Sequence, residues 1–194
     1  MTSIQAQVLL KVDQNFLSSK EVINNIDKYK KMVRRGGIDL YTTEGALSII
    51  CDGDELLGVE FWDEINIVLD SIISQIPSYV QGKAISEFMP LQSFWIHIKP
   101  LGSDCLWELN SATKLKPFLL KRSLPSKQLF QSLTLAYILM AKILAELGSE
   151  SFSSTIQLWS IELPEEIKLA VSDVTELIKV VRMDVKTAAE YIGC

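Results

Sequence analysis

The stretch 94-FWIHIKPLGSDCLWELN-110 decides the fold, because it has the pattern of two strands joined by a short turn. Apolar and polar residues alternate along both halves, as in a strand with one face in a core. Placing Lys99 opposite Asp104 pairs Ile98 with Cys105 and makes one face wholly apolar. The same register gives the pairs Ile96 with Trp107 and Phe94 with Leu109. This stretch therefore predicts an antiparallel hairpin with one buried face.

A second hairpin is predicted upstream, where residues 46–51 and 55–59 flank the sequence Asp52-Gly53-Asp54. An Asp-Gly pair suits a tight turn that requires positive φ. Residues 4–12 alternate between apolar and polar side chains and predict one more half-buried strand. Residues 115–121 predict a further strand, and their proline favours the edge of the sheet.

Two helices are predicted between these strands. The first follows a cap at Ser18 or Ser19, carries apolar residues at helical spacing and ends before Gly36. The second begins near Asp63, where acidic residues favour a helix N-terminus, and ends at Pro77.

The longest predicted helix has Pro125 in its first turn, runs to Leu147 and stops at Gly148. It is almost long enough to span a bilayer, but a central charge there costs about 2.5–3.5 kcal/mol. The polar residues that interrupt it are Gln131, Ser132, Lys142 and Glu146. We therefore expect a buried central helix, and no membrane as a partner.

The fold class expected from these elements is α+β, with an antiparallel sheet packed against long helices. One domain is predicted over residues 1–148, followed by a polar linker at 149–155. Residues 156–194 predict a helical C-terminal extension that packs on the same domain. A chain of 194 residues buries enough surface to fold without metal or disulfide staples.

Composition indicates the cellular compartment and the class of partner. Three cysteines without metal-ligand spacing indicate reduced thiols, and residues 1–16 lack the pattern of a secretory leader, so we expect a cytoplasmic protein. The net charge of −5 disfavours nucleic acid as a partner. The basic residues between Lys28 and Arg35 are spread around their helix, which favours a solvated face over a phosphate-binding one.

No catalytic residue, metal ligand or cofactor site is predicted. His97 is the single histidine, and Ser93 on the same strand face would lie roughly 13 Å away, too far for a nucleophile. The acidic run after Asp52 fails the calcium-loop pattern at its glycine position, and no Gly-rich phosphate loop occurs. An alternative stays open: a small-molecule enzyme or ligand-binding protein with a pocket near the 94–110 hairpin, between the sheet and the helix that begins at Pro125. His97, Trp95 or Glu108 would lie near this pocket.

The charge distribution has one anomaly. Residues 51–70 hold seven carboxylates and no lysine or arginine, so this segment is −7 and the rest of the chain is +2. Roles in a turn and at a helix N-terminus explain four of the seven. The others could form an acidic surface that steers a basic protein, with an aromatic anchor. The predicted partner-binding residues are Asp52, Asp54, Glu55, Glu60, Trp62, Asp63 and Glu64. A merely solvated face is the competing interpretation.

The order of strand, acidic hairpin, Trp62-Asp63 helix, Phe94-Trp95 strand pair and long helix resembles cytoplasmic immunity proteins of bacterial contact-dependent or polymorphic toxin systems. The resemblance covers residues 4–147 and concerns layout and acidity. It implies inhibition without catalysis, by tight binding that occludes a basic toxin domain. It assigns no functional residue, and it predicts no oligomeric state.

Overall fold

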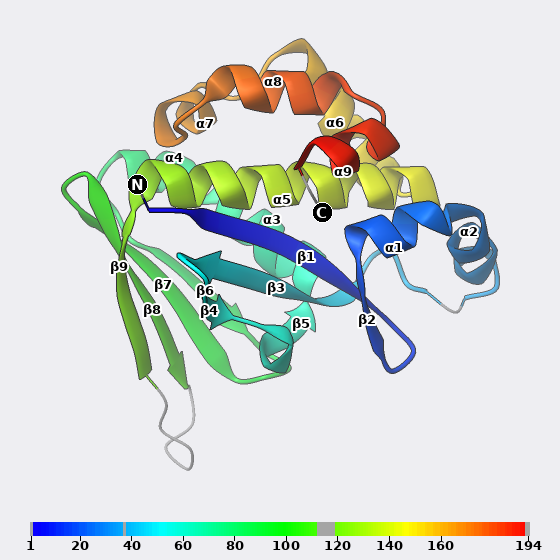
Figure 1. Ribbon diagram of the computed structural model, residues 1–194, viewed down its shortest axis with the longest axis horizontal. Coiled ribbons are helices and arrows are strands. Elements are labelled where there is room, and N and C mark those ends of the chain that lie inside the picture. Colours follow the sequence, from blue (N-terminus) through cyan, green and yellow to red (C-terminus); the bar gives the residue numbers. More distant parts are fainter. Residues whose placement is uncertain (1, 37, 112–118, 193–194) are drawn as a thin grey trace.

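The computed structural model describes residues 2–36, 38–111 and 119–192, and Figure 1 shows antiparallel sheets and several helices. All strand pairs among the described residues are antiparallel. The predicted α+β class is confirmed, although the strands form two sheets. Part of the predicted 115–121 strand lies outside the described residues.

Sheet A has the strand order β2-β1-β3-β4, and β5 also pairs with β3. Its strands are β1 (Ile4–Val12), β2 (Asn15–Ser18), β3 (Glu44–Cys51), β4 (Asp54–Leu57) and β5 (Trp62–Glu64). The β3–β4 turn has positive φ at both central residues, 52° at Asp52 and 89° at Gly53, which confirms the predicted Asp-Gly turn. A short 3-10 helix, η1 (Val59–Phe61), connects β4 to β5.

Sheet B has the order β6-β7-β8-β9, with β6 (Ile85–Met89), β7 (Phe94–Leu101), β8 (Asp104–Ser111) and β9 (Leu119–Pro125). The predicted β7–β8 register was wrong by two residues, because Leu101 rather than Lys99 lies opposite Asp104. Gly102, with φ of 65°, permits a two-residue turn, so the strands extend further than expected. A shift of two keeps each side chain on its predicted face.

Helices α1 (Ser19–Asn24) and α2 (Ile26–Arg34) replace the single first helix that was predicted. Ser18 forms a capping box with Glu21, whose carboxylate accepts the Ser18 amide at 2.8 Å. Helix α3 (Ile65–Ser74) begins later than expected, because Asp63 belongs to β5, and α4 (Ile76–Val80) follows it.

Helix α5 (Ser126–Leu147) is the predicted central helix, and it ends at Gly148 with φ of 114°. Its polar interruptions make tertiary contacts: Ser132 Oγ accepts the Ala6 amide at 2.7 Å, and Gln131 Oε1 accepts the Asp173 amide at 3.0 Å. Within the described chain it is the one helix long and apolar enough to cross a membrane. Most of its surface is buried in the fold, as in a soluble protein.

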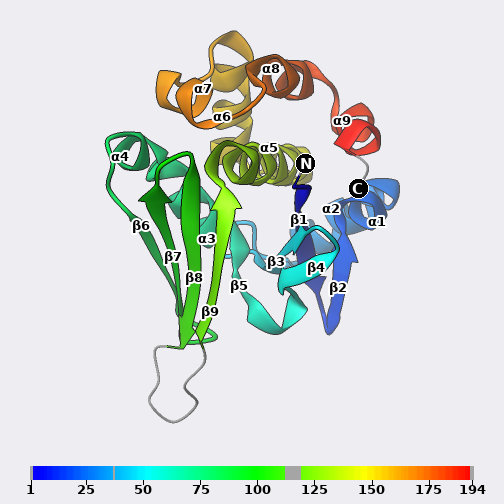
Figure 2. The same cartoon turned by 60° about the vertical axis from the view of Figure 1, so that its left-hand side comes forward.

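Four helices follow α5: α6 (Glu150–Ile161), α7 (Glu165–Ala170), α8 (Val174–Arg182) and α9 (Val185–Ile192). The predicted linker at 149–155 was wrong, because most of it forms the first turns of α6. Figures 1 and 2 show these helices as an arch over α5, on the side away from the sheets. Their apolar faces join the same hydrophobic cluster as the two sheets and α5.

Candidate functional site

The seven carboxylates of segment 51–70 do not form one ridge. Asp63 is fully buried, Glu64 is partly buried, and Asp70 is exposed but lies on α3, beside α5. The remaining four are also exposed, and they lie on the β3–β4 turn, β4 and η1. We call these four the acidic hairpin: Asp52, Asp54, Glu55 and Glu60.

Two members of the acidic hairpin have polar partners. Asp52 Oδ1 accepts the Ser3 amide at 2.7 Å. Asp54 Oδ2 lies 3.5 Å from Arg122 Nη2 on β9, but both side chains are well exposed, at 70% and 43%. An exposed pair of this kind contributes at most about 1 kcal/mol. The arginine therefore offsets one charge without burying it.

Glu55 and Glu60 converge on each other from β4 and η1. An ideal Cβ placed on Gly58, between them, would lie 2.8 Å from both Glu55 Oε1 and Glu60 Oε2. Among the described residues, no ion pair involves either carboxylate. The pair thus presents two neighbouring negative charges to solvent.

Trp62 lies apart from the turn of the acidic hairpin. It pairs with Ala46, whereas Asp54 pairs with Cys51. Five residues along β3 correspond to about 17 Å. Lys11 Nζ lies 3.4 Å from the centre of the Trp62 ring and also pairs with Glu44 at 2.6 Å. The ring therefore already has a cation over one face.

Asp63 has an internal role. Its Oδ1 accepts the Glu64 amide at 2.8 Å, and its Oδ2 accepts the Leu91 amide at 3.0 Å. Burial raises the pKa of this carboxyl, and the backbone donors act against that rise. The side chain ties β5 to the turn between β6 and β7, so it does not belong to an exposed surface. Glu64 lies opposite Glu44 in the β3–β5 pair, at the Trp62 end.

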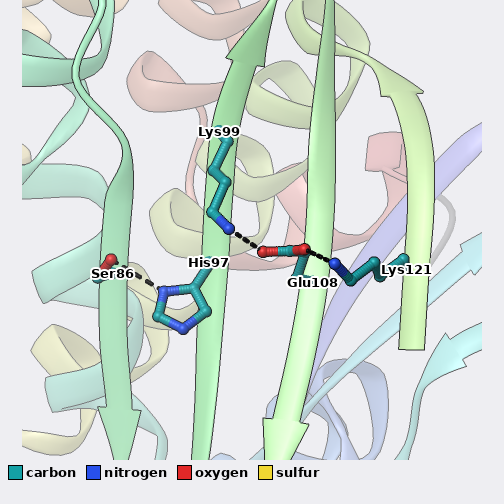
Figure 3. Close-up of polar contacts among 5 residues, drawn as sticks. All are labelled: Ser86, His97, Lys99, Glu108 and Lys121. Atoms are coloured by element: carbon teal, nitrogen blue, oxygen red, sulfur yellow. Dashed lines mark hydrogen bonds and ion pairs between the residues drawn. The ribbon is translucent and has the colours of Figure 1, made fainter. Parts of the chain in front are cut away.

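The residues of the alternative hypothesis lie on the outer face of sheet B (Figure 3). Ser86 Oγ lies 2.9 Å from His97 Nδ1, and the Trp95 ring stacks on the imidazole at 5.8 Å. Burial and the nearby Lys99 charge lower the pKa of His97. This face is opposite the one that packs on α5, because the inward residues of β7 are Ile96 and Ile98. The expected pocket between sheet B and α5 is therefore not where these side chains lie.

Glu108 is paired within the same face. Lys99 and Lys121, on the strands either side, each form an ion pair with one of its oxygens (Figure 3). Hydrogen bonds from both lysines lower its pKa, with Lys121 the stronger cause. The carboxylate is thus engaged by lysines rather than by His97. The described residues contain no cluster of three metal-ligating groups.

Sequence reasoning missed Ser86, because strand β6 was not predicted. The sequence Ile85-Ser86-Glu87-Phe88-Met89 does not alternate between apolar and polar residues, so it has no strand periodicity. The alternation is visible only in the burial of the strand, where both ends are buried and Ser86 is exposed. Ser86 reaches His97 because the two residues are cross-strand partners in the β6–β7 pair.

The chain matches no protein-family model, no curated protein and no solved structure. Within segment 51–70, the acidic hairpin carries the largest exposed charge excess.

Proposed function

We propose that this protein is a non-enzymatic binding module that occludes a basic partner domain through the acidic hairpin, as a cytoplasmic immunity protein occludes its toxin. The observation that carries the proposal is the convergence of Glu55 and Glu60 over Gly58, exposed and without an ion pair among the described residues. Two like charges held together in this way favour binding of a partner's lysine or arginine.

The local field supports a basic partner. The acidic hairpin carries four negative charges, and Arg122 offsets one of them. A net excess of one sign steers an oppositely charged partner and raises its association rate, most strongly at low salt. Trp62, Asp63 and Glu64 are left out of the proposed contact, because Lys11 covers the tryptophan ring and Asp63 is buried.

Protection of a sheet edge is the competing explanation for these charges. Strand β4 lies at the edge of sheet A, where charged side chains prevent pairing with another chain. A lysine protects an edge as well as a glutamate does. Changing Glu55 and Glu60 to lysine therefore keeps edge protection and removes attraction for a basic partner.

The test begins with purification of the tagged protein from its native cells at low salt, followed by association kinetics with whatever basic protein accompanies it. We expect E55K/E60K to slow association by at least about tenfold at low salt, with the difference shrinking as salt rises. A matched control, D27K/E190K, makes the same change in net charge at exposed positions of α2 and α9. Equal rates for the two double variants would exclude the acidic hairpin as the contact surface.

A second candidate is a small-molecule enzyme or ligand-binding protein that uses the outer face of sheet B. The supporting observation is the Ser86–His97 contact of 2.9 Å, with Trp95 stacked on the imidazole. A serine and a histidine at this distance could act as nucleophile and base. If this candidate is correct, H97A loses turnover of an ester substrate panel that the unaltered protein hydrolyses. If the unaltered protein hydrolyses none of these esters, the enzyme candidate is excluded.

A further inference from the structure

A groove lined by both polar and apolar side chains separates α3 from the α5–α6 junction. Its volume is about 660 Å³, within the range of small-molecule sites. One wall comes from α3, with Asn66, Ile67 and Asp70, and the other from the start of α6, with Ser151 and Phe152. Tyr41, 83% exposed, stands at the rim, and the Asn66 side chain holds its segment by donating to the Tyr41 carbonyl at 2.8 Å.

A hydrogen bond from α5 holds the Asp70 side chain in this groove. The hydroxyl of Tyr137, a residue of α5 that is 2% exposed, donates to Asp70 Oδ1 at 2.6 Å. Burial raises the pKa of Tyr137, and the hydrogen bond to Asp70 raises it further, so this hydroxyl stays protonated and remains a donor. One carboxylate oxygen is therefore held in place, and Oδ2 is left to accept from a ligand.

Three hydroxyl groups of the lining have already used their protons. Ser71 Oγ donates to Glu87, Ser74 Oγ donates to the Ser71 carbonyl at 2.9 Å, and Thr155 Oγ1 donates to the Ser151 carbonyl at 3.2 Å. Each oxygen keeps lone pairs but has no proton to offer. Among the described residues that line the groove there is no lysine, arginine or histidine. The groove is thus rich in acceptors and carries negative charge.

We propose that this groove binds a small molecule bearing a primary ammonium or guanidinium group, with Asp70 as its counter-ion. An ammonium has three donors and a guanidinium has five, and neither has an acceptor, so both can donate to Asp70 Oδ2 and to the hydroxyl oxygens of the lining. The exposed Tyr41 ring offers a face for a second cationic group of the same ligand. The site does not depend on the acidic hairpin and adds to the proposed function.

The test uses spermidine and agmatine as probes in titration calorimetry at low salt, with 1,5-pentanediol as the neutral comparison. We expect saturable binding of at least one amine and none of the diol. D70N keeps the shape of the side chain and an acceptor for Tyr137, and should weaken binding by about tenfold or more. D27N, which removes an exposed carboxylate of α2, should bind as the unaltered protein does.

A second variant keeps the proposal testable if D70N fails to fold. S151R places a guanidinium at an exposed lining position and should abolish amine binding by filling the site. Amide chemical shifts should change on titration at residues 66–74 and 149–155, and not at the acidic hairpin. No saturable binding of either amine, undiminished binding in folded D70N, or shifts confined to the acidic hairpin would each overturn the proposal.

Discussion

Replacing Lys142 by methionine should weaken the packing of the C-terminal helices on α5. This lysine is only 7% exposed, and its Nζ donates to the Val181 carbonyl at 2.7 Å and the Met183 carbonyl at 2.6 Å. Both carbonyls stand at the C-terminal end of α8, where backbone acceptors lack helical partners and a positive charge is favourable. The ammonium thus caps α8 from the neighbouring helix.

The magnitude follows from the two hydrogen bonds. Each bond from a charged donor contributes about 1.5–3 kcal/mol, and the cost of burying the ammonium offsets part of their sum. Methionine fills similar space without a donor and leaves two carbonyls unsatisfied. We expect K142M to lower the free energy of unfolding by about 3 kcal/mol, which is roughly 6–12 °C in Tm for a chain of this size.

The assay is urea unfolding followed by circular dichroism, with K186M, an exposed lysine of α9, as the matched control. Hydrogen exchange should show faster opening of α8 and α9 in K142M than in the control. If K142M and K186M unfold within about 0.5 kcal/mol of each other, Lys142 does not cap α8.

The same lysine predicts a pH dependence. Burial lowers its pKa from the ordinary 10.5, against the opposing charge of Asp184. Between the lowered value and 10.5 the unfolded chain binds more protons than the folded one, so stability should rise with pH in that window. In K142M this contribution should be absent, and unfolding measured from pH 7 upward would show it.

Two further predictions concern sheet B and the acidic hairpin. E108Q should lower the free energy of unfolding by about 1–2 kcal/mol at pH 7, because Lys99 and Lys121 lose a shared counter-charge. Since the folded pKa of Glu108 is depressed, its contribution is present above the unfolded value of 4.5 and disappears as pH falls through the folded pKa. Urea unfolding of both proteins from pH 7 to pH 3 should therefore converge, and a constant gap would contradict the assignment. G53A should cost about 1 kcal/mol through backbone strain alone, because φ there is 89° and a Cβ would meet nothing within 4 Å. A thermal melt of G53A that matches the unaltered protein would show that the turn adopts another conformation.

Local sequence determined the features that depend on near neighbours. The positive φ at Asp52 and Gly53 and the stop at Gly148 were predictable, because few residues tolerate those conformations. The faces of the β7–β8 hairpin were predictable because side chains alternate along a strand, although the register was not. The length of the turn determines that register, and the sequence is compatible with more than one turn length.

Tertiary structure alone decided which charges are exposed. Asp63 and Glu55 lie eight positions apart in one acidic segment. Asp63 is nevertheless buried and accepts hydrogen bonds from two backbone amides, whereas Glu55 is exposed beside Glu60. The hydrogen bond to Asp70 also depends on tertiary structure, because its donor Tyr137 is 67 residues away in the chain. Such pairings depend on how sheets and helices pack in three dimensions. Charge composition is additive along a sequence, whereas exposure and hydrogen-bond partners depend on residues that meet only after folding.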